Sequence, residues 1–445
     1  MFDLDLAWDR PARTGSQPSS HTLRVRIVPG SSHGPLSSGL PVRMAIALDM
    51  SGSMTGDKLV QAKHACEKVI AMLRAEDRLS LAGFSTELLP ILDDLPGGPQ
   101  SAQIATRALQ RMFAIGVTRA DVALSWLEKA LPPTPGAMRV GIIITDGHPT
   151  DPMGGKNIDP KPLIDMASRM GRAGVTICAV GLGDAAAFNT AFLTQVSDRG
   201  HGAFLHAETP AGLEQVLAAR LSASQAMAIA DAALEAHMVL PGAAVRAACR
   251  FRPEYLPLEI EQSGGVFRAA IGSVRADSIT DVLIAVDVPA PASNADEVWS
   301  SGLAEAAEVR LVGDGSAVLS SARAVIANTA SYSDAQRRNA EVEKDRLSWE
   351  VNLYSDALMK AQEAGPDAAN PRRTGQLLTG MEQSARRAGN EQLASDVAAQ
   401  IGHLRQTGRL DNVRATGLLT ASRSLVGEPL NRQTGLLGEP DGSGE

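Results

Sequence analysis

The strongest pattern along the chain is an unbroken run of five apolar residues at 44–48, which turns polar at once in Asp49-Met-Ser51-Gly-Ser53. Such a run predicts a strand that is buried on both faces of a parallel sheet. A helical pattern follows, with apolar positions that recur every three to four residues from Leu59 to Leu73. The segment therefore predicts a strand, a polar loop and a helix in succession.

Between residues 42 and 226, apolar runs and helical patterns alternate. A second buried strand is predicted at 139–145, and it ends in Asp146 as the first one ends in Asp49. Alternation of this kind is typical of an α/β domain with a doubly wound, mostly parallel sheet.

The pattern changes to short strands separated by turns at 236–328, which predicts a small β-sandwich. One strand far from it in the sequence, at 21–28, alternates apolar and polar residues and needs a sheet to join. We assign the N-terminal segment 1–41 to the β-sandwich through this strand, and we expect residues 1–20 to be a loose lead-in. The α/β domain at 42–226 is then an insertion in the β-sandwich.

A helical region is predicted at 334–410, as hairpins joined by short links, and a flexible tail at 411–445. An Arg-x-Thr-Gly motif or a close variant recurs in this part of the chain around Thr374, Thr416 and Thr434. Thr374 is expected to cap a helix, whereas Thr434 in the tail is a candidate for phosphorylation and for binding a phosphothreonine reader. Chance recurrence together with helix capping is the alternative explanation.

Composition narrows the class of protein. The chain has 445 residues, of which 44% are hydrophobic and 21% charged, as in ordinary globular proteins. A net charge of −8 argues against general nucleic-acid binding and against electrostatic capture by an anionic membrane. No apolar run approaches the ~18 residues of a membrane span, and no apolar signal-peptide core lies near the first residue. Three widely spaced cysteines cannot all pair with one another, so we expect a reducing compartment, the cytoplasm.

Oxygen-bearing side chains follow the predicted strands at their carboxyl ends, where open α/β sheets bind ligands. They come from three loops and form one candidate metal site: Asp49, Ser51, Ser53, Thr118 and Asp146. Carboxylates and hydroxyls are hard ligands that suit Mg²⁺ or Mn²⁺ and not zinc. Two carboxylates at most balance the charge of the ion, so a carboxylate from a partner is expected to be welcome beside it. Each residue also has a plain structural explanation, namely helix capping by the hydroxyls and a turn at Asp146.

The set Asp49-x-Ser51-x-Ser53, Thr118 and Thr145-Asp146-Gly147 resembles the metal-ion-dependent adhesion site of von Willebrand factor type A domains. The resemblance covers about residues 42–226. It implies a central sheet flanked by helices, a bound divalent cation and a protein partner that supplies an acidic side chain. One departure is that Arg119 follows the threonine, where small or amide residues are common in the family. The wider layout resembles intracellular bacterial proteins in which a β-sandwich encloses this domain and a helical tail follows.

We therefore expect a cytoplasmic, Mg²⁺-dependent adaptor or scaffold that grips an acidic residue of a protein partner and contacts neither nucleic acid nor membrane. No nucleophile elbow, phosphate loop or paired acid and base is apparent, so no enzymatic activity is expected. Three alternatives stay open. They are a regulatory component of an AAA+ ATPase or of a kinase-linked phosphothreonine system, a secreted adhesin, and a metal-dependent hydrolase.

Overall fold

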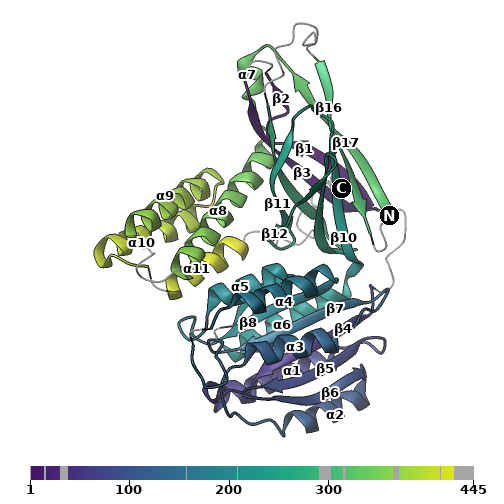
Figure 1. Ribbon diagram of the computed structural model, residues 1–445, viewed down its shortest axis with the longest axis vertical. Helices are drawn as coiled ribbons and strands as arrows, with labels where there is room; N and C mark the ends of the chain where they lie inside the picture. Colours follow the sequence, from purple (N-terminus) through teal and green to yellow (C-terminus); the bar gives the residue numbers. More distant parts are fainter. Residues whose placement is uncertain are drawn as a thin grey trace, which may run out of the picture.

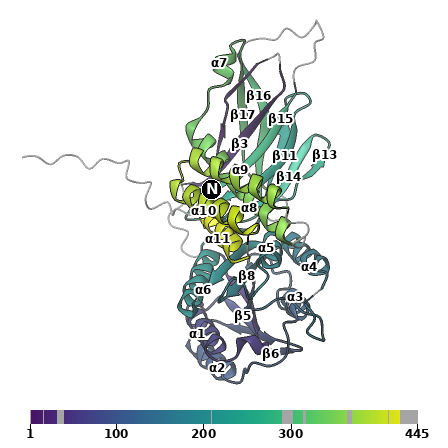
Figure 2. The same ribbon diagram turned by 90° about the vertical axis from the view of Figure 1, so that its left-hand side faces the viewer.

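The computed structural model describes residues 2–14, 17–30, 39–156, 158–207, 209–289, 302–313, 317–363, 370–410 and 412–424. These residues form an α/β domain, a β-sandwich at one end of it, and a group of C-terminal helices beside both (Figure 1). The view in Figure 2 shows the same stacking of the β-sandwich on the α/β domain. No helix within these ranges is both long and apolar enough to cross a membrane.

The α/β domain contains a six-stranded sheet in the order β6-β5-β4-β7-β8-β9, which is parallel except for β6 at one edge. Its strands are β4 (Val42–Asp49), β5 (Arg78–Phe84), β6 (Leu88–Pro96), β7 (Met138–Thr145), β8 (Val175–Leu182) and β9 (His201–Ala207). Its helices are α1 (Asp57–Ala71), α2 (Pro99–Leu109), α3 (Ala120–Ala130), α4 (Lys161–Arg172), α5 (Thr190–Arg199) and α6 (Pro210–Gln225).

Helices cover both faces of this sheet. In β4, Met44 and Ile46 share a core with α1, α2 and α6, whereas Ala45 and Ala47 share a second core with α3, α4 and α5. Successive side chains of a strand point to opposite faces, so both faces of β4 are buried. The predicted doubly wound, mostly parallel sheet is confirmed.

Two sheets packed face to face form the β-sandwich, in the orders β1-β3-β15-β11-β12 and β13-β14-β10-β16-β17-β2. The first contains β1 (Phe2–Trp8), β3 (Ser19–Pro29), β15 (Thr280–Val288), β11 (Ala244–Arg252) and β12 (Leu256–Leu258). The second contains β13 (Glu261–Ser263), β14 (Val266–Arg275), β10 (Met227–Met238), β16 (Gly302–Val312), β17 (Val318–Asn328) and β2 (Ala12–Arg13).

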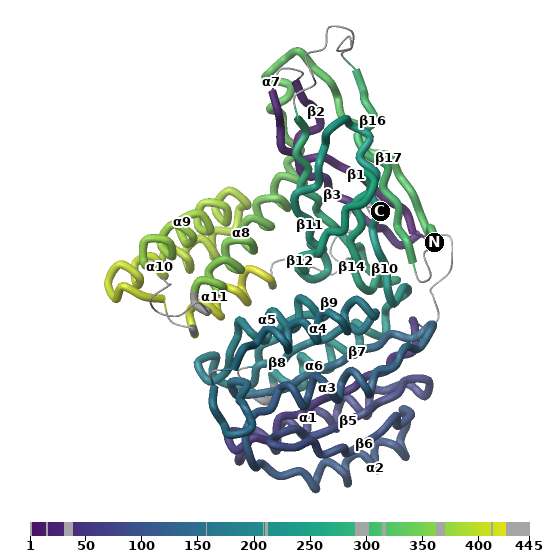
Figure 3. Tube along the Cα trace, viewed as in Figure 1, coloured from purple at the N-terminus to yellow at the C-terminus, as the bar shows by residue number. Residues whose placement is uncertain are grey.

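Strand β3 pairs with β1 on one side and with β15 on the other. Figure 3 shows these N-terminal strands, in purple, among the later strands in teal and green. The chain therefore enters the sandwich before the α/β domain and returns to it afterwards. The α/β domain is an insertion, as the amphipathic strand at 21–28 predicts.

Two strands of the sandwich differ from expectation. The loose lead-in expected at 1–20 is wrong, because Phe2–Trp8 form strand β1 and the side chains of Phe2 and Trp8 are buried. The alternation of apolar and acidic residues in this strand is the signal of a half-buried edge strand. The part of the sandwich that follows the α/β domain also starts earlier than residue 236, at Met227 of β10. Alanine dominates β10, and alanine carries little strand preference.

The C-terminal helices are α7 (Tyr332–Ala335), α8 (Ala340–Glu363), α9 (Pro371–Arg387), α10 (Glu391–Thr407) and α11 (Asn412–Ser424). The prediction of a flexible tail at 411–445 is therefore wrong for residues 412–424, which form α11. Helix α11 is held by neighbours, since Ala415 and Leu419 share a small core with Ala191 of α5 and Met359 of α8. Residues beyond Ser424, Thr434 among them, lie outside the described residues.

The threonines of the recurring motif have different surroundings. Thr374 does not cap α9, because the side chain of Asn370 accepts the capping hydrogen bond from the backbone amide of Arg372. Thr416 is buried in α11, and its hydroxyl lies 2.8 Å from the hydroxyl of Thr190 in α5. These two copies of the motif therefore share no structural role.

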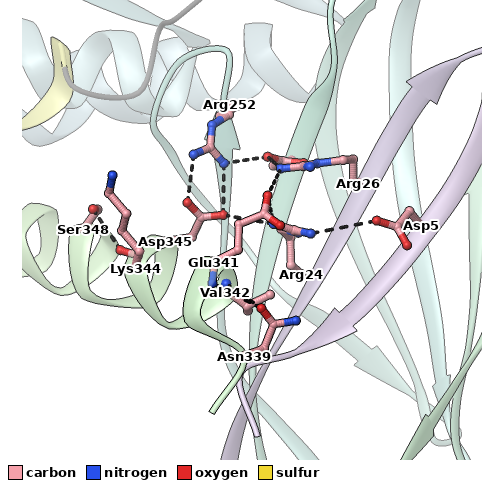
Figure 4. Close-up of polar contacts among 11 residues, drawn as sticks. Asp5, Arg24, Arg26, Arg252, Asn339, Glu341, Val342, Lys344, Asp345 and Ser348 are labelled. Atoms are coloured by element: carbon pink, nitrogen blue, oxygen red, sulfur yellow. Dashed lines mark hydrogen bonds and ion pairs between the residues drawn. The ribbon is translucent and has the colours of Figure 1, made fainter. Parts of the chain in front are cut away.

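Helix α8 is fixed to the β-sandwich by a cluster of ion pairs (Figure 4). Three arginines and four carboxylates from β1, β3, β11, β15 and α8 take part: Arg24, Arg26, Arg252, Asp5, Asp281, Glu341 and Asp345. Arg252 bridges the buried carboxylates of Asp281 and Asp345 at 2.6 and 2.8 Å. Alternation along β3 places its apolar side chains in the core of the sandwich and Arg24 and Arg26 on the face that meets α8.

A single arginine of α11 joins all three parts of the molecule. The guanidinium of Arg423 donates hydrogen bonds to both oxygens of Asp198 in α5, at 2.8 and 2.9 Å, and to Asp356 in α8 at 2.9 Å. It lies 5.3 Å from the centre of the Tyr255 ring in the β-sandwich. The hydroxyl of Tyr255 in turn donates to Asp356 at 3.1 Å. One guanidinium thus links α11 to α5, to α8 and to the β-sandwich.

The α/β domain and the β-sandwich also meet directly. Arg220 of α6 binds both carboxylate oxygens of Glu254, at 3.0 and 2.9 Å. Nearby, burial and the positive charges of Arg250 and Arg172 together lower the pKa of His201 from its ordinary value to about 4, with burial as the largest cause. This junction therefore holds a neutral histidine among cations.

Lowering the pH from about 6.5 to about 4 is expected to lower the free energy of unfolding through His201. The unfolded chain binds a proton on this side chain near its ordinary pKa of 6.5, whereas the folded protein does so only near 4. Protons in this window therefore favour the unfolded state. In His201→Asn, which suits the left-handed φ of 56° at this position, the effect should disappear. Urea unfolding should show that the free energy of unfolding falls less between pH 7 and pH 5 in His201→Asn than in the wild type. An equal fall in both proteins would contradict the prediction.

Candidate metal centre

Strands β4 and β7 are neighbours and end side by side, which brings Asp49 next to Thr145 and Asp146. The loop after β4 is also tied to residues 115–116. The amide of Ile115 donates a hydrogen bond to the carbonyl of Met50 at 2.6 Å. The amide of Gly52 donates one to the carbonyl of Gly116 at 3.0 Å. Three loops therefore meet at the carboxyl end of the sheet, where open α/β sheets bind ligands.

Asp49 is fully buried at the centre of this edge. One carboxylate oxygen accepts a hydrogen bond from the Ser51 amide at 2.7 Å, and the other accepts one from the Thr145 hydroxyl at 2.6 Å. Burial raises the pKa of Asp49 to about 6, although these hydrogen bonds oppose the shift, and the charge of Asp146 raises the pKa as well. A bound cation would relieve the cost of keeping this carboxylate ionised.

Ser51, Ser53 and Asp146 form a chain of polar contacts. The hydroxyl oxygens of Ser51 and Ser53 lie 3.0 Å apart, and the Ser53 hydroxyl donates to one oxygen of Asp146 at 2.6 Å. The other oxygen of Asp146 accepts a hydrogen bond from Nζ of Lys58 at 2.5 Å. The motif after β4 and the aspartate after β7 therefore share one polar cluster.

Thr118 reaches the same place from the third loop. Its carbonyl accepts hydrogen bonds from the amide and the hydroxyl of Thr150, at 2.8 and 3.1 Å. A Cβ atom added at Gly147 would lie 2.9 Å from the Thr118 hydroxyl and 3.7 Å from the Ser53 hydroxyl. The glycine thus leaves a space between these two hydroxyls that a side chain would fill.

Helix capping does not account for the hydroxyls. The short helical turn at 52–54 has Ser51 at its N-cap, α1 has Gly56 and α3 has Arg119, and none of the three has a side-chain capping hydrogen bond. The Arg119 guanidinium is held by Asp121, with Nε 2.8 Å from one carboxylate oxygen. The capping explanation for Ser51, Ser53 and Thr118 is therefore not supported.

The donor set fits a hard divalent cation. Two carboxylates and three hydroxyls offer oxygen alone, as Mg²⁺ and Mn²⁺ prefer. Gly52 and Ser53 are exposed, so solvent and a partner can reach this side of the cluster. Across the described ranges no group of three or more His, Cys, Asp and Glu could hold a metal ion, so binding here needs the hydroxyls.

Lys58 is the member of the cluster that sequence reasoning missed. Its side chain is 41% exposed, yet its ammonium binds the fully buried carboxylate of Asp146. In the sequence, Lys58 lies outside the apolar positions that recur from Leu59 to Leu73 in the helix after the motif. The only signal was its position in the first turn of that helix, five residues beyond Ser53.

The family model of the von Willebrand factor type A domain matches residues 44–219. An uncharacterized protein of Synechocystis sp. is 22% identical over 284 residues, which cover 62% of this chain and 64% of that protein. The human inter-alpha-trypsin inhibitor heavy chain H4 is 32% identical over 125 residues, which cover 25% of this chain and 13% of that protein. The chain thus spans less than two thirds of the length of both relatives.

Solved structures extend the likeness to nearly the whole chain. A von Willebrand factor type A protein from Catenulispora acidiphila has a TM-score of 0.74 at 18% identity, covering 95% of this chain and 96% of that one. The ArnB paralog VWA2 from Sulfolobus acidocaldarius has a TM-score of 0.54 at 14% identity, covering 95% and 98%. At these identities the likeness concerns the fold. Together with the match of the family model, it shows that residues 44–219 form a von Willebrand factor type A domain.

Proposed function

We propose that this protein is a Mg²⁺-dependent protein-binding adaptor that engages an acidic residue of a partner at the carboxyl end of the sheet. Mg²⁺, or Mn²⁺ in its place, would be held by the five side chains already named: Asp49, Ser51, Ser53, Thr118 and Asp146. The observation that supports the proposal is the convergence of these oxygens from three loops, with the space beside Gly147. We further propose a cytoplasmic location, with three buried cysteines that form no disulfide.

The charge of the cluster favours an acidic partner. Two carboxylates balance a divalent ion, and Lys58 adds one positive charge beside Asp146. A bound Mg²⁺ would attract oxygen ligands, and a carboxylate of a partner protein would bind it more strongly than a neutral group. The role proposed is binding and not catalysis, and a screen with phosphoester and peptide substrates tests that part. Recruitment of a phosphothreonine reader through Thr434 stays a prediction.

Calorimetric titration with Mg²⁺ tests the proposal directly. Asp49→Ala and the exposed-site variant Ser53→Ala are expected to lower the affinity for Mg²⁺ by more than about tenfold, because each removes an oxygen of the set. Lys58→Gln is expected to raise the affinity about fivefold, equivalent to ~1 kcal/mol, because it removes a positive charge close to the ion. Circular dichroism should show that all three variants keep the fold.

Lys68→Gln is the matched control for the lysine variant, because Lys68 lies on the same helix and faces Glu214 instead. It should leave the affinity for Mg²⁺ unchanged. The functional readout is capture of partners from native lysate with Mg²⁺ and with EDTA. Capture that is equal in both, or Mg²⁺ binding that is unchanged in Asp49→Ala, would refute the adaptor mechanism.

A further inference from the structure

A cleft of about 1460 Å³ separates helices α4 and α5 of the α/β domain from helices α8, α9 and α10. It starts at His148, two residues beyond Asp146, and includes Lys156 of the same loop. At the far end it reaches Glu259 of the β-sandwich. All three parts of the molecule therefore contribute to one groove that begins beside the candidate metal centre.

Positive charge dominates the cleft. Six cationic side chains line it against two acidic ones, Asp165 and Glu259: Lys156, Lys161, Arg169, Arg172, Arg199 and Arg409. This is an excess of four positive charges, from six minus two, in a chain whose net charge is −8. Such a concentration of one sign in a groove attracts ligands of the opposite sign.

The two acidic residues are already neutralised by neighbours. Asp165 accepts from Lys161 at 2.6 Å, one turn away on α4. Glu259 binds Arg199 and lies 3.6 Å from Arg172. Lys156, Arg169 and Arg409 form no direct ion pair with a carboxylate among the residues described here, although the charge of Arg169 helps to lower the pKa of Asp165. These three cations are therefore available to a ligand.

Apolar side chains also line the cleft. Ile158, Ile164 and Leu410 line it and are only partly buried, so part of each remains accessible to a ligand. A groove lined by cationic and apolar side chains complements a segment that carries both acidic and apolar side chains. The volume exceeds the ~300–1,000 Å³ of typical small-molecule pockets, which favours a stretch of polypeptide over a small anion. The strongly negative net charge opposes a long polynucleotide.

We propose that this cleft binds a segment of a protein partner that is rich in Asp and Glu and carries interspersed apolar residues. The proposal rests on the adaptor function in taking the partner to be a protein, and it assigns a second contact surface that does not need the metal. The apolar side chains would pack on Ile158, Ile164 and Leu410. The carboxylates would pair with Lys156, Arg169 and Arg409.

Fluorescence anisotropy of a labelled peptide that repeats Glu-Glu-Leu tests this on the full chain in EDTA, which silences the metal centre. We expect binding that weakens as salt is added, and at least fivefold weaker binding for Arg169→Glu and for Lys156→Glu. Arg337→Glu is the matched control, because Arg337 is 80% exposed and does not line the cleft. Circular dichroism and unfolding of each variant check the fold.

Four results would overturn the proposal. The first is equal peptide affinity in the wild type, Arg169→Glu and Lys156→Glu. The second is binding that vanishes in EDTA, which would place the peptide at the metal centre and leave the adaptor function standing. The third is equal binding of a single-stranded RNA of matched charge. The fourth is a large gain in peptide affinity when the acidic residues Glu428, Glu439 and Asp441 are neutralised, which would identify this chain's own tail as the occupant.

A different result would refute the adaptor function and leave the cleft proposal intact. In that case the protein binds the peptide in EDTA but shows no binding of Mg²⁺ in calorimetry. The cleft would then stand as a docking surface, and the metal-dependent adaptor function would fail.

Discussion

Replacing Arg423 by methionine is expected to lower the free energy of unfolding by about 3–5 kcal/mol and to release helix α11 from the α/β domain. Methionine keeps an unbranched apolar stem but removes the guanidinium that binds Asp198 and Asp356. Two carboxylates at the junction would then lose their shared cation. An uncompensated buried charge costs far more than an exposed one, because the protein interior screens it poorly.

The loss should depend on pH in a defined direction. Burial raises the pKa of Asp198, while the charge of Arg423 lowers it. Without Arg423 the pKa of Asp198 in the folded variant should rise further above the unfolded value. Protons then favour the folded variant, so its deficit relative to the wild type should be largest at neutral pH and shrink on acidification. Urea unfolding at pH 7 and pH 5 measures this.

The double variant Arg423→Met/Asp198→Asn is the control for the ion pair. It should recover part of the stability lost by Arg423→Met, because the carboxylate left unpaired is then neutral. Hydrogen exchange should show faster exchange of α11 amides in the single variant. If Asp198→Asn lowers the free energy of unfolding equally in the Arg423→Met variant and in the wild type, the lost pairing with Asp198 does not explain the lower stability of Arg423→Met.

Asp345→Asn is expected to lower the free energy of unfolding by about 3 kcal/mol, the second largest effect we foresee. The carboxylate of Asp345 is 4% exposed and binds Arg252 at 2.8 and 3.0 Å, with Arg24 at 3.5 Å. Asparagine keeps the shape of the side chain but removes its charge, so Arg24 and Arg252 would be left short of negative charge in a buried cluster.

Glu341→Gln is the matched control, because Glu341 also binds Arg24, together with Arg26, from one turn earlier on α8 but is 58% exposed. Water screens this carboxylate, so its loss should cost under about 1 kcal/mol. Chemical denaturation of both variants gives the comparison. Equal costs would show that burial does not set the strength of this cluster.

Local patterns were sufficient for the central domain. Five apolar residues at 44–48 are long enough for a strand with two buried faces, and the alternation of such strands with helices admits few topologies. The amphipathic strand at 21–28 identified the insertion, because a half-buried strand must join a sheet. Strand β1 carries the same alternation, but the Pro, Ser and Gly residues that follow it from Pro11 onwards favour a loop.

Helix α11 and strand β10 could not be identified in the same way. The apolar face of α11 is short, and Ala415 and Leu419 become a core only because α5 and α8 approach them. Strand β10 is rich in alanine, which is compatible with either element, and its sheet partners β14 and β16 lie later in the chain. In both cases distant contacts decide the structure, and a short window of sequence does not contain them.

The candidate metal centre shows the same division between local and distant information. The sequence by itself determined which side chains carry oxygen ligands, and their position after parallel strands determined that they meet at one sheet edge, because such strands end on the same side. Only the tertiary structure decided what else is present there: the ammonium of Lys58 on Asp146, and the cationic cleft that begins beside the site. Both features need side chains from separate elements to lie close together in space. The packing of helices and domains sets the distances between these side chains, and spacing along the chain does not.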